Sequence, residues 1–129
     1  MQTPKPTAAE TEILTVLWEL GPSTVRAVHE VLERRRPTGY TTVLKQLQIM
    51  SGKGSVLRDE RERTHVYRAA QPREAVQGEL VGDLIDRAFD GSAAELVMRA
   101  LSTQPASAAE LDRIRAMLDQ LGDKPRKGR

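Results

Sequence analysis

The sequence predicts a mainly α-helical chain, in which three helices and a small β-hairpin are followed by a second helical region. Three observations predict this fold class. Apolar residues recur at three- and four-residue steps along most of the chain, as they do in amphipathic helices. One Gly-Pro pair and several short polar turns separate these stretches from one another. Residues 55–69 show period-two alternation on both sides of a charged turn, which is typical of a β-hairpin.

The first two helices are expected at about residues 8–20 and 25–35. Thr7 and Glu10 fit a capping box at the start of the first helix, and a Gly-Pro pair ends it. Ser23 or Thr24 is expected to cap the second helix. That helix closes on three consecutive arginines, residues 34–36. They suit either a solvated helix end, where cations are favoured by the helix dipole, or contact with phosphates, and the sequence leaves both open.

Residues 39–53 predict the third helix, whose apolar face carries Val43, Leu44, Leu47 and Met50. The opposite face is polar and has no carboxylate between residues 40 and 50, although the chain is rich in Asp and Glu. In a DNA major groove, Lys binds guanine, Gln binds adenine, and Thr contacts a base edge or a thymine methyl group. The face is therefore a candidate DNA contact, and the alternative is an ordinary solvated face. Its residues are Thr41, Thr42, Lys45, Gln46 and Gln48.

The hairpin that follows the third helix is expected within residues 55–69. Gly52, just before it, costs roughly 1 kcal/mol relative to Ala within a helix, so fraying of the third helix before Lys53 is expected. A charged hairpin after a helix-turn-helix is typical of the wing in a winged helix-turn-helix domain.

Four arginines on this wing suit backbone phosphates or a narrow minor groove, namely Arg58, Arg61, Arg63 and Arg68. The alternative is a solvated hairpin whose positive charge is balanced by neighbouring carboxylates. Those carboxylates belong to Asp59, Glu60 and Glu62.

Three further amphipathic helices are expected at about residues 72–89, 93–101 and 107–121. Pro72 fits a first helical turn, and Ser107 with Glu110 repeats the capping-box pattern. Short amphipathic helices outside a small domain have little of their own to pack against, and an identical chain is the commonest partner. Homodimerisation is therefore expected through Leu80, Leu84, Ile85, Phe89, Leu96, Leu111, Ile114 and Leu118.

Charge divides the chain in the same way. Residues 24–73 contain 11 Lys and Arg against 5 Asp and Glu, whereas residues 74–121 contain 4 against 9. A basic segment beside an acidic one suggests that the basic segment binds a polyanion and that the acidic segment binds a different partner. The expected organisation is a flexible N-terminus at 1–6, a DNA-binding domain at 7–71, a dimerisation region at 72–121 and a disordered basic tail at 122–129.

Composition argues against several other classes of protein. The 129 residues include no Cys and only two His, so thiolate chemistry and a zinc site are not expected, nor is any other metal or cofactor. No phosphate-binding glycine loop or nucleophile elbow is present, and an enzyme is not expected. Aromatic residues make up 3%, which argues against a stacking platform for single strands. No signal peptide or membrane-spanning run is recognised, and a cytoplasmic location is expected.

Several short motifs together resemble the penicillinase-repressor family of BlaI and MecI type. They are residues 13–19 (ILTVLWE), 24–32 (TVRAVHEVL), 40–43 (YTTV), 53–54 (KG) and 66–68 (VYR). Their order and spacing carry the resemblance, which spans about residues 7–121. Residues 89–92 (FDGS) and 110–111 (EL) also fall where that family has its dimerisation helices.

The resemblance implies a winged-helix repressor that binds a palindromic operator in double-stranded DNA as a homodimer. It implies a recognition helix at 41–53, with Thr42 and Lys45 as the first candidates for base contact, and a wing at 55–69. In characterised relatives a membrane sensor-protease system responds to β-lactam and the repressor is cleaved. The bond cleaved in staphylococcal members is Asn-Phe, whereas the matching place here is Arg99-Ala100. Without cysteine, the copper-responsive mode of one branch is not expected.

Two other functions stay open on the sequence alone. A winged-helix protein-interaction module would use its basic face for an acidic protein, and Ile49 on the third helix favours it. An architectural DNA-binding protein without sequence preference would show the same basic segment.

Overall fold

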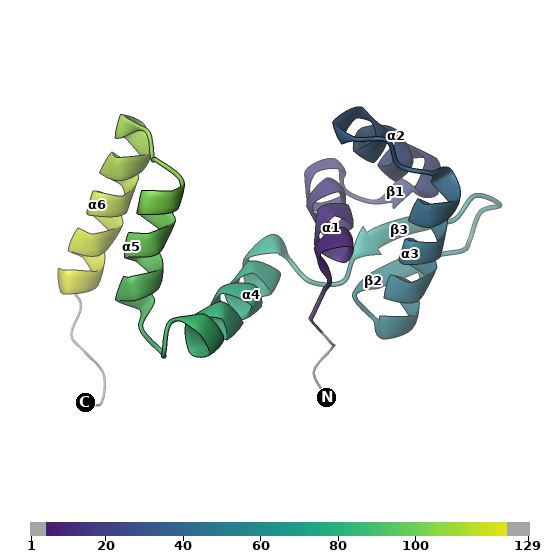
Figure 1. The fold of residues 1–129 in the computed structure, drawn as a ribbon. Helices are drawn as coiled ribbons and strands as arrows, with labels where there is room; N and C mark the ends of the chain where they lie inside the picture. Colours follow the sequence, from purple (N-terminus) through teal and green to yellow (C-terminus); the bar gives the residue numbers. More distant parts are fainter. Residues whose placement is uncertain (1–4, 124–129) are drawn as a thin grey trace. The chain divides into compact units, whose positions relative to one another are not determined.

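The computed structural model describes residues 5–123, and the chain divides into two compact units, residues 1–83 and 84–129. The first unit contains three helices, three short strands and the start of a fourth helix (Figure 1). The elements of the chain are α1 (Ala8–Leu20), β1 (Ser23–Thr24), α2 (Val25–Arg35), α3 (Tyr40–Lys53), β2 (Val56–Asp59), β3 (Val66–Ala69), α4 (Arg73–Ala88), α5 (Ala93–Thr103) and α6 (Ala108–Asp123).

The predicted starts of α1 and α2 are confirmed. The hydroxyl of Thr7 accepts from the amide of Glu10 at 3.2 Å, and the Glu10 carboxylate accepts from the Thr7 amide at 2.9 Å. This reciprocal pair is the expected capping box, which satisfies two amides that have no partner within the helix. Thr24, rather than Ser23, caps α2 by accepting from the amide of Ala27 at 3.1 Å.

The expected fraying of α3 is not observed. The helix continues through Gly52 to Lys53, and Gly54 closes it in the left-handed region, with φ at +84°. The amide of Gly54 donates to the carbonyl groups of Met50 and Ser51, so the last turn is capped. The side chain of Lys53 also forms an ion pair with α1, and that contact offsets the weak helix propensity of Gly52.

The predicted hairpin is present as β2 and β3, which pair in antiparallel register with Arg58 opposite Tyr67. The sequence did not predict β1, which pairs with the other edge of β3 and gives the strand order β1-β3-β2. Two residues are too few to show period-two alternation, so β1 has no signal of its own. It matters because it places the start of α2 beside the wing.

The core of the first unit is aliphatic apart from Tyr67, as the low aromatic content predicts. Its buried side chains come from α1, α2, α3, β2, β3 and the first turn of α4. Trp18 lies at the edge of this core, and its indole N–H donates to the carbonyl oxygen of Gln71 at 3.0 Å. The guanidinium of Arg73 lies 5.8 Å from the centroid of the same ring. These contacts attach the start of α4 to α1.

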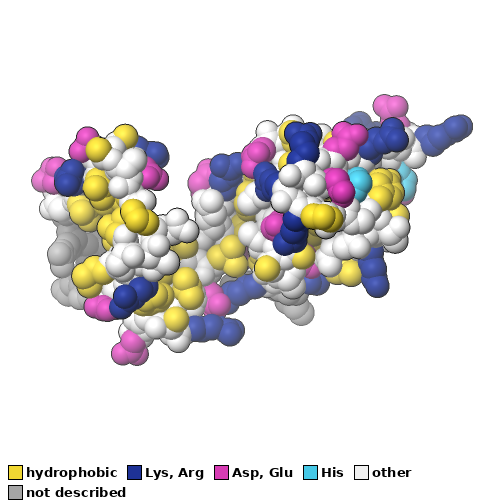
Figure 2. All heavy atoms as spheres, turned by 45° about the horizontal axis from the view of Figure 1, so that its top comes forward, with side chains coloured by type: hydrophobic (Ala, Val, Ile, Leu, Met, Phe, Trp, Pro, Cys, Tyr) yellow, Lys and Arg dark blue, Asp and Glu magenta, His cyan; other side chains and the backbone are white. Residues whose placement is uncertain are grey.

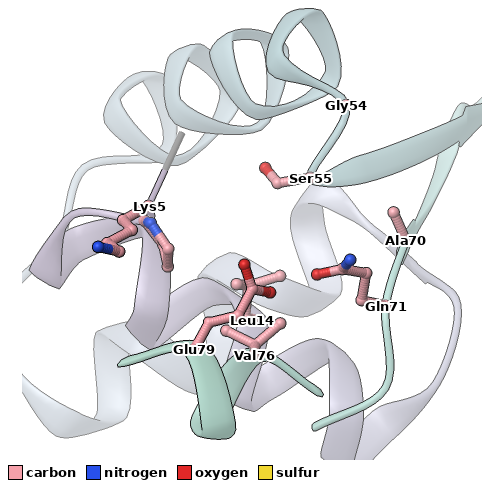
Figure 3. A pocket seen from close by; sticks show the side chains of 9 residues that line it. Lys5, Leu14, Gly54, Ser55, Ala70, Gln71, Val76 and Glu79 are labelled. Carbon is pink, nitrogen blue, oxygen red and sulfur yellow. The ribbon is translucent and has the colours of Figure 1, made fainter. Parts of the chain in front are cut away.

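The boundary between the compact units falls inside α4, because Val76 is buried in the first core and Leu80 packs against it. A cavity of about 220 Å³ lies within the first unit, and Figure 3 shows Leu14, Val76 and Glu79 on one side of it and Ser55 on another. The functional division expected at 71/72 stays a prediction.

The second unit contains the end of α4, α5 and α6. Ser92 caps α5, and Ser107 with Glu110 forms the second predicted capping box at 2.9 and 3.1 Å. No side chain in the described part of this unit is fully buried. Of the expected tail, Gly122 and Asp123 belong to α6, and the rest lies outside the described residues. No helix in residues 5–123 has the length and apolar character needed to cross a membrane.

Candidate nucleic-acid interface

The polar face of α3 is exposed, as the sequence predicts. Val43, Leu47 and Met50 are buried on the opposite side, so the position of each polar residue follows from the helical repeat. Of the predicted contact residues, Thr41, Thr42, Lys45 and Gln48 are exposed and Gln46 is half-buried. Ile49 is 40% exposed on the same side and is the one large aliphatic residue there. The face therefore offers hydroxyl, ammonium and amide groups with no carboxylate among them.

Three contacts fix the start of α3 and the residues just before it. The Nε2–H of His29 donates to the carbonyl oxygen of Thr38 at 2.7 Å, and the amide of Thr38 donates to the Glu33 carboxylate at 2.9 Å. The ring of His29 also meets the ring of Tyr40 edge-on, with centroids 5.7 Å apart. Sequence reasoning missed this role, although the spacing of His29 and Glu33 on one face of α2 was a signal.

One ion pair fixes the last turn of α3. The Nζ of Lys53 lies 2.8 Å from the carboxylate of Glu10, whose residue is only 3% exposed. Burial acts to raise the pKa of Glu10, but the bonds from Lys53 and Thr7 outweigh it and leave that pKa below its usual value. Glu10 also caps α1, so the same carboxylate caps the start of α1 and binds the end of α3, the candidate recognition helix.

Among the described residues, two of the four wing arginines form ion pairs and two do not. Arg58 pairs with Glu60 at 2.9 Å, and Arg61 pairs with Asp59 at 2.6 Å. Arg63 and Arg68 are exposed, and neither forms an ion pair within the described residues. The sequence suggested two alternatives, free arginines or arginines balanced by carboxylates, and the hairpin contains both.

A groove of about 290 Å³ lies between α3, the wing and the first turn of α2. Arg26, Arg58 and Arg63 line it together with Tyr40 and Gln48. Arg26 was not among the predicted contacts. A cation in the first turn of a helix opposes the helix dipole, and this unfavourable placement is the signal that could have identified it.

The arginine run at the end of α2 is largely engaged within the protein. Arg35 pairs with Glu19 at 3.5 Å, and Arg36 pairs with Glu12, both on α1. Arg34 is exposed and has no ion pair in the described part of the chain. Contact with α1 is therefore a third role, distinct from the two that the sequence left open, and it applies to two of the three arginines.

The expected dimerisation residues occupy different environments. Leu84 is 47% exposed and Leu118 is 59% exposed, whereas Leu80 packs against the core of the first unit. The remaining five are half-buried within their own unit, and they are Ile85, Phe89, Leu96, Leu111 and Ile114. Four more apolar residues of the second unit are exposed, although they were not among the expected dimerisation residues: Val97, Met98, Met117 and Leu121. Figure 2 shows hydrophobic side chains at the surface of this unit and Lys and Arg side chains prominent on the first.

Among residues 5–123, no three His, Asp or Glu side chains gather closely enough to hold a metal ion. The arrangement is that of a binding surface, in which cations and hydrogen-bonding groups line one helix, one hairpin and the groove between them.

Comparison with known proteins agrees with this geometry. Residues 6–120 match the family model described as penicillinase repressor. The chain is 32% identical over 124 residues to the transcriptional regulator BlaI of Mycobacterium tuberculosis, in strains CDC 1551 and H37Rv, and the alignment covers 92% of this chain and 89% of that protein.

Two solved structures share the fold. One is the monomeric form of Bacillus licheniformis BlaI in complex with the blaP half-operator, with a TM-score of 0.50, 20% identity, and coverage of 57% of this chain and 89% of that one. The other is RosR of H. salinarum, with a TM-score of 0.52, 21% identity, and coverage of 94% and 97%. The predicted winged-helix fold class is confirmed.

Proposed function

The chain belongs to the penicillinase repressor family of DNA-binding transcriptional regulators, and on that premise we propose that it acts as a homodimer on a palindromic operator. The family consists of regulators rather than enzymes. One observation carries the proposal for this chain, namely the exposed and carboxylate-free face of α3, which is held at both ends by contacts to α1 and α2.

In this proposal α3 enters the major groove. Lys45 and Thr42 contact base edges, with Thr41, Gln46 and Gln48 beside them, because these side chains match the donors and acceptors of that groove. Contacts at both ends of α3 support it, since base recognition requires a helix with a fixed position relative to the phosphates. Arg26, Arg63 and Arg68 face the sugar-phosphate backbone, where they supply affinity that falls with salt.

The second unit supplies the dimer interface. Its helices expose Leu84, Met98, Met117, Leu118 and Leu121, each at 47% or more, although the chain has a separate core. Exposed apolar residues at this density on short helices are typical of a surface that another chain covers. Two-fold pairing of this surface would place two recognition helices in successive major grooves, about one DNA turn apart.

Family resemblance also leads us to propose a membrane sensor-protease system as a partner in the cytoplasm. The place that matches the family's cleavage bond, Arg99-Ala100, lies in the middle of α5. Both residues are exposed, but a helical backbone does not fit an extended protease cleft. Cleavage there therefore requires local unwinding of α5, which is consistent with the absence of fully buried side chains in the described part of that helix.

The test is binding to the DNA upstream of the gene that encodes the protein, measured by gel shift against random competitor DNA at two salt concentrations. Binding that survives the competitor and weakens with salt supports a specific repressor, and footprinting then locates the operator. Equal removal by random DNA would favour an architectural protein. No binding at low salt would favour the protein-interaction module, and the exposed Ile49 would then be part of its protein-binding surface.

A further inference from the structure

The wing pairs two of its arginines with carboxylates before any DNA is present. The Nε and Nη2 atoms of Arg58 lie 3.0 and 2.9 Å from one oxygen of Glu60. Arg61 forms a bidentate pair with Asp59, with nitrogen-oxygen distances of 3.0 and 2.6 Å, and its amide donates to the same carboxylate at 3.0 Å. Both pairs join residues two positions apart, so the hairpin itself brings them together.

Three other charged residues of the wing differ from these pairs. Arg63 and Arg68 form no ion pair within the described residues, and neither does Glu62, which lies between the paired segment and Arg63. In the described part of the chain, the wing thus contains two arginines held in ion pairs and two that are not, of which Arg68 still lies close enough to Asp59 to help lower the pKa of that carboxyl. A hairpin selected only for positive charge would not need the two paired carboxylates.

An arginine that is already paired with a carboxylate adds little affinity for a DNA phosphate. A free arginine that neutralises a phosphate releases a condensed counterion, and this release supplies most of the affinity for random DNA. An arginine already held by a carboxylate must exchange one anion for another, and the displaced carboxylate then lies close to the phosphate. The bonds from Arg61 lower the pKa of Asp59 to about 2, so this carboxylate stays ionised well below neutral pH.

We propose that Asp59 and Glu60 are specificity-determining residues, which withhold Arg61 and Arg58 from the phosphate backbone. This inference rests on the proposed function as a DNA-binding repressor. Wing contact with phosphates then depends on Arg63 and Arg68 alone. The affinity for random DNA is kept low, while base contacts from α3 are unaffected, so the ratio of operator binding to random binding rises.

The test compares Asp59→Asn and Glu60→Gln with the wild type on two duplexes. One is the segment protected in the footprint, and the other is a random sequence of the same length. The amide side chain introduced by D59N keeps an oxygen that can accept from the Arg61 amide, so this variant retains the turn while removing the charge. The measurement is the logarithmic slope of affinity against salt between about 50 and 200 mM, the range over which phosphate contacts change affinity strongly.

Each variant should steepen the slope on random DNA by about 0.9, because one more arginine becomes available to a phosphate. Over a fourfold change in salt this slope corresponds to about a 3-fold additional change in affinity. The ratio of operator to random binding should fall. Combining D59N with Arg61→Gln should restore the wild-type slope, and Arg63→Gln alone should reduce it by about 0.9.

Glu62→Gln is the matched control, because it removes the same charge from the same hairpin but releases no arginine. Its slope should equal that of the wild type. If E62Q steepened the slope as much as E60Q, the effect would be one of net charge, and the inference would be wrong. Weaker binding of E60Q and D59N to both duplexes would also overturn it, since the carboxylates would then orient the arginines toward DNA. A wild type that binds neither duplex would reject the proposed function itself.

Discussion

Replacing Lys53 with Met tests the link between the recognition helix and α1. The variant keeps most of the side-chain volume but leaves the Glu10 carboxylate, 3% exposed, without its cation. Breaking a fully buried ion pair costs about 3–5 kcal/mol. The side chain of Lys53 is 31% exposed and the Thr7 amide still donates to Glu10, so water and one hydrogen bond compensate in part. We expect a loss of about 1–3 kcal/mol in the free energy of unfolding at pH 7.

The assay is urea unfolding followed by the fluorescence of Trp18, the only tryptophan, which reports on the first unit alone. This choice matters because a chain with two compact units need not unfold in one step. Arg35→Gln is the matched control, since it breaks an ion pair whose partners are 43% and 53% exposed. Exposed pairs contribute about 0–1 kcal/mol, so the control should lie close to the wild type.

The same pair gives a pH dependence with a definite sign. The folded-state pKa of Glu10 is lowered, so its contribution is fully present above the unfolded value and is lost as pH falls through the folded value. The advantage of wild type over K53M should therefore be largest near neutral pH and should shrink below about pH 4. A K53M variant as stable as R35Q, or an advantage that stays constant down to about pH 3, would refute this reasoning.

Three further predictions concern the core, the bases and the dimer. Leu47→Ala should lower the stability of the first unit by about 2–5 kcal/mol in the same fluorescence assay, because Leu47 is fully buried, while Ile49→Ala should change it far less. Lys45→Met should reduce the preference for operator over random DNA in gel shifts, whereas equal loss on both would assign Lys45 to phosphate contact. Leu84→Asp with Leu118→Asp should give monomers in sedimentation equilibrium and weak operator binding, and a persistent dimer would place the interface elsewhere.

Local rules predicted the helices well. The two capping boxes, at Thr7 and Ser107, lie where the spacing of a hydroxyl and a glutamate predicts them, because both partners are three residues apart in the chain. The polar face of α3 also followed from the helical repeat alone. The predicted fraying of α3 at Gly52 was wrong, because an ion pair with the distant helix α1 stabilises the last turn.

The contacts that position the candidate site were not predictable in the same way. Glu10 and Lys53 are 43 residues apart, and although the sequence predicts Glu10 as a helix cap, no local pattern pairs it with Lys53. Strand β1 has no periodic signal, because it consists of two residues that pair with the distant strand β3. The role of Arg26 depends on that strand, which places the first turn of α2 beside the wing.

By itself the sequence determined the order of the helices, the wing, the polar face of α3 and the family, because each depends on local periodicity or on short motifs in order. Only the tertiary structure decided which charges are available. Arg35 and Arg36 are engaged by α1, Arg58 and Arg61 by wing carboxylates, and Arg63 by neither. The physical reason is that an ion pair depends on a distance of a few ångströms, and that distance is fixed by how the elements pack.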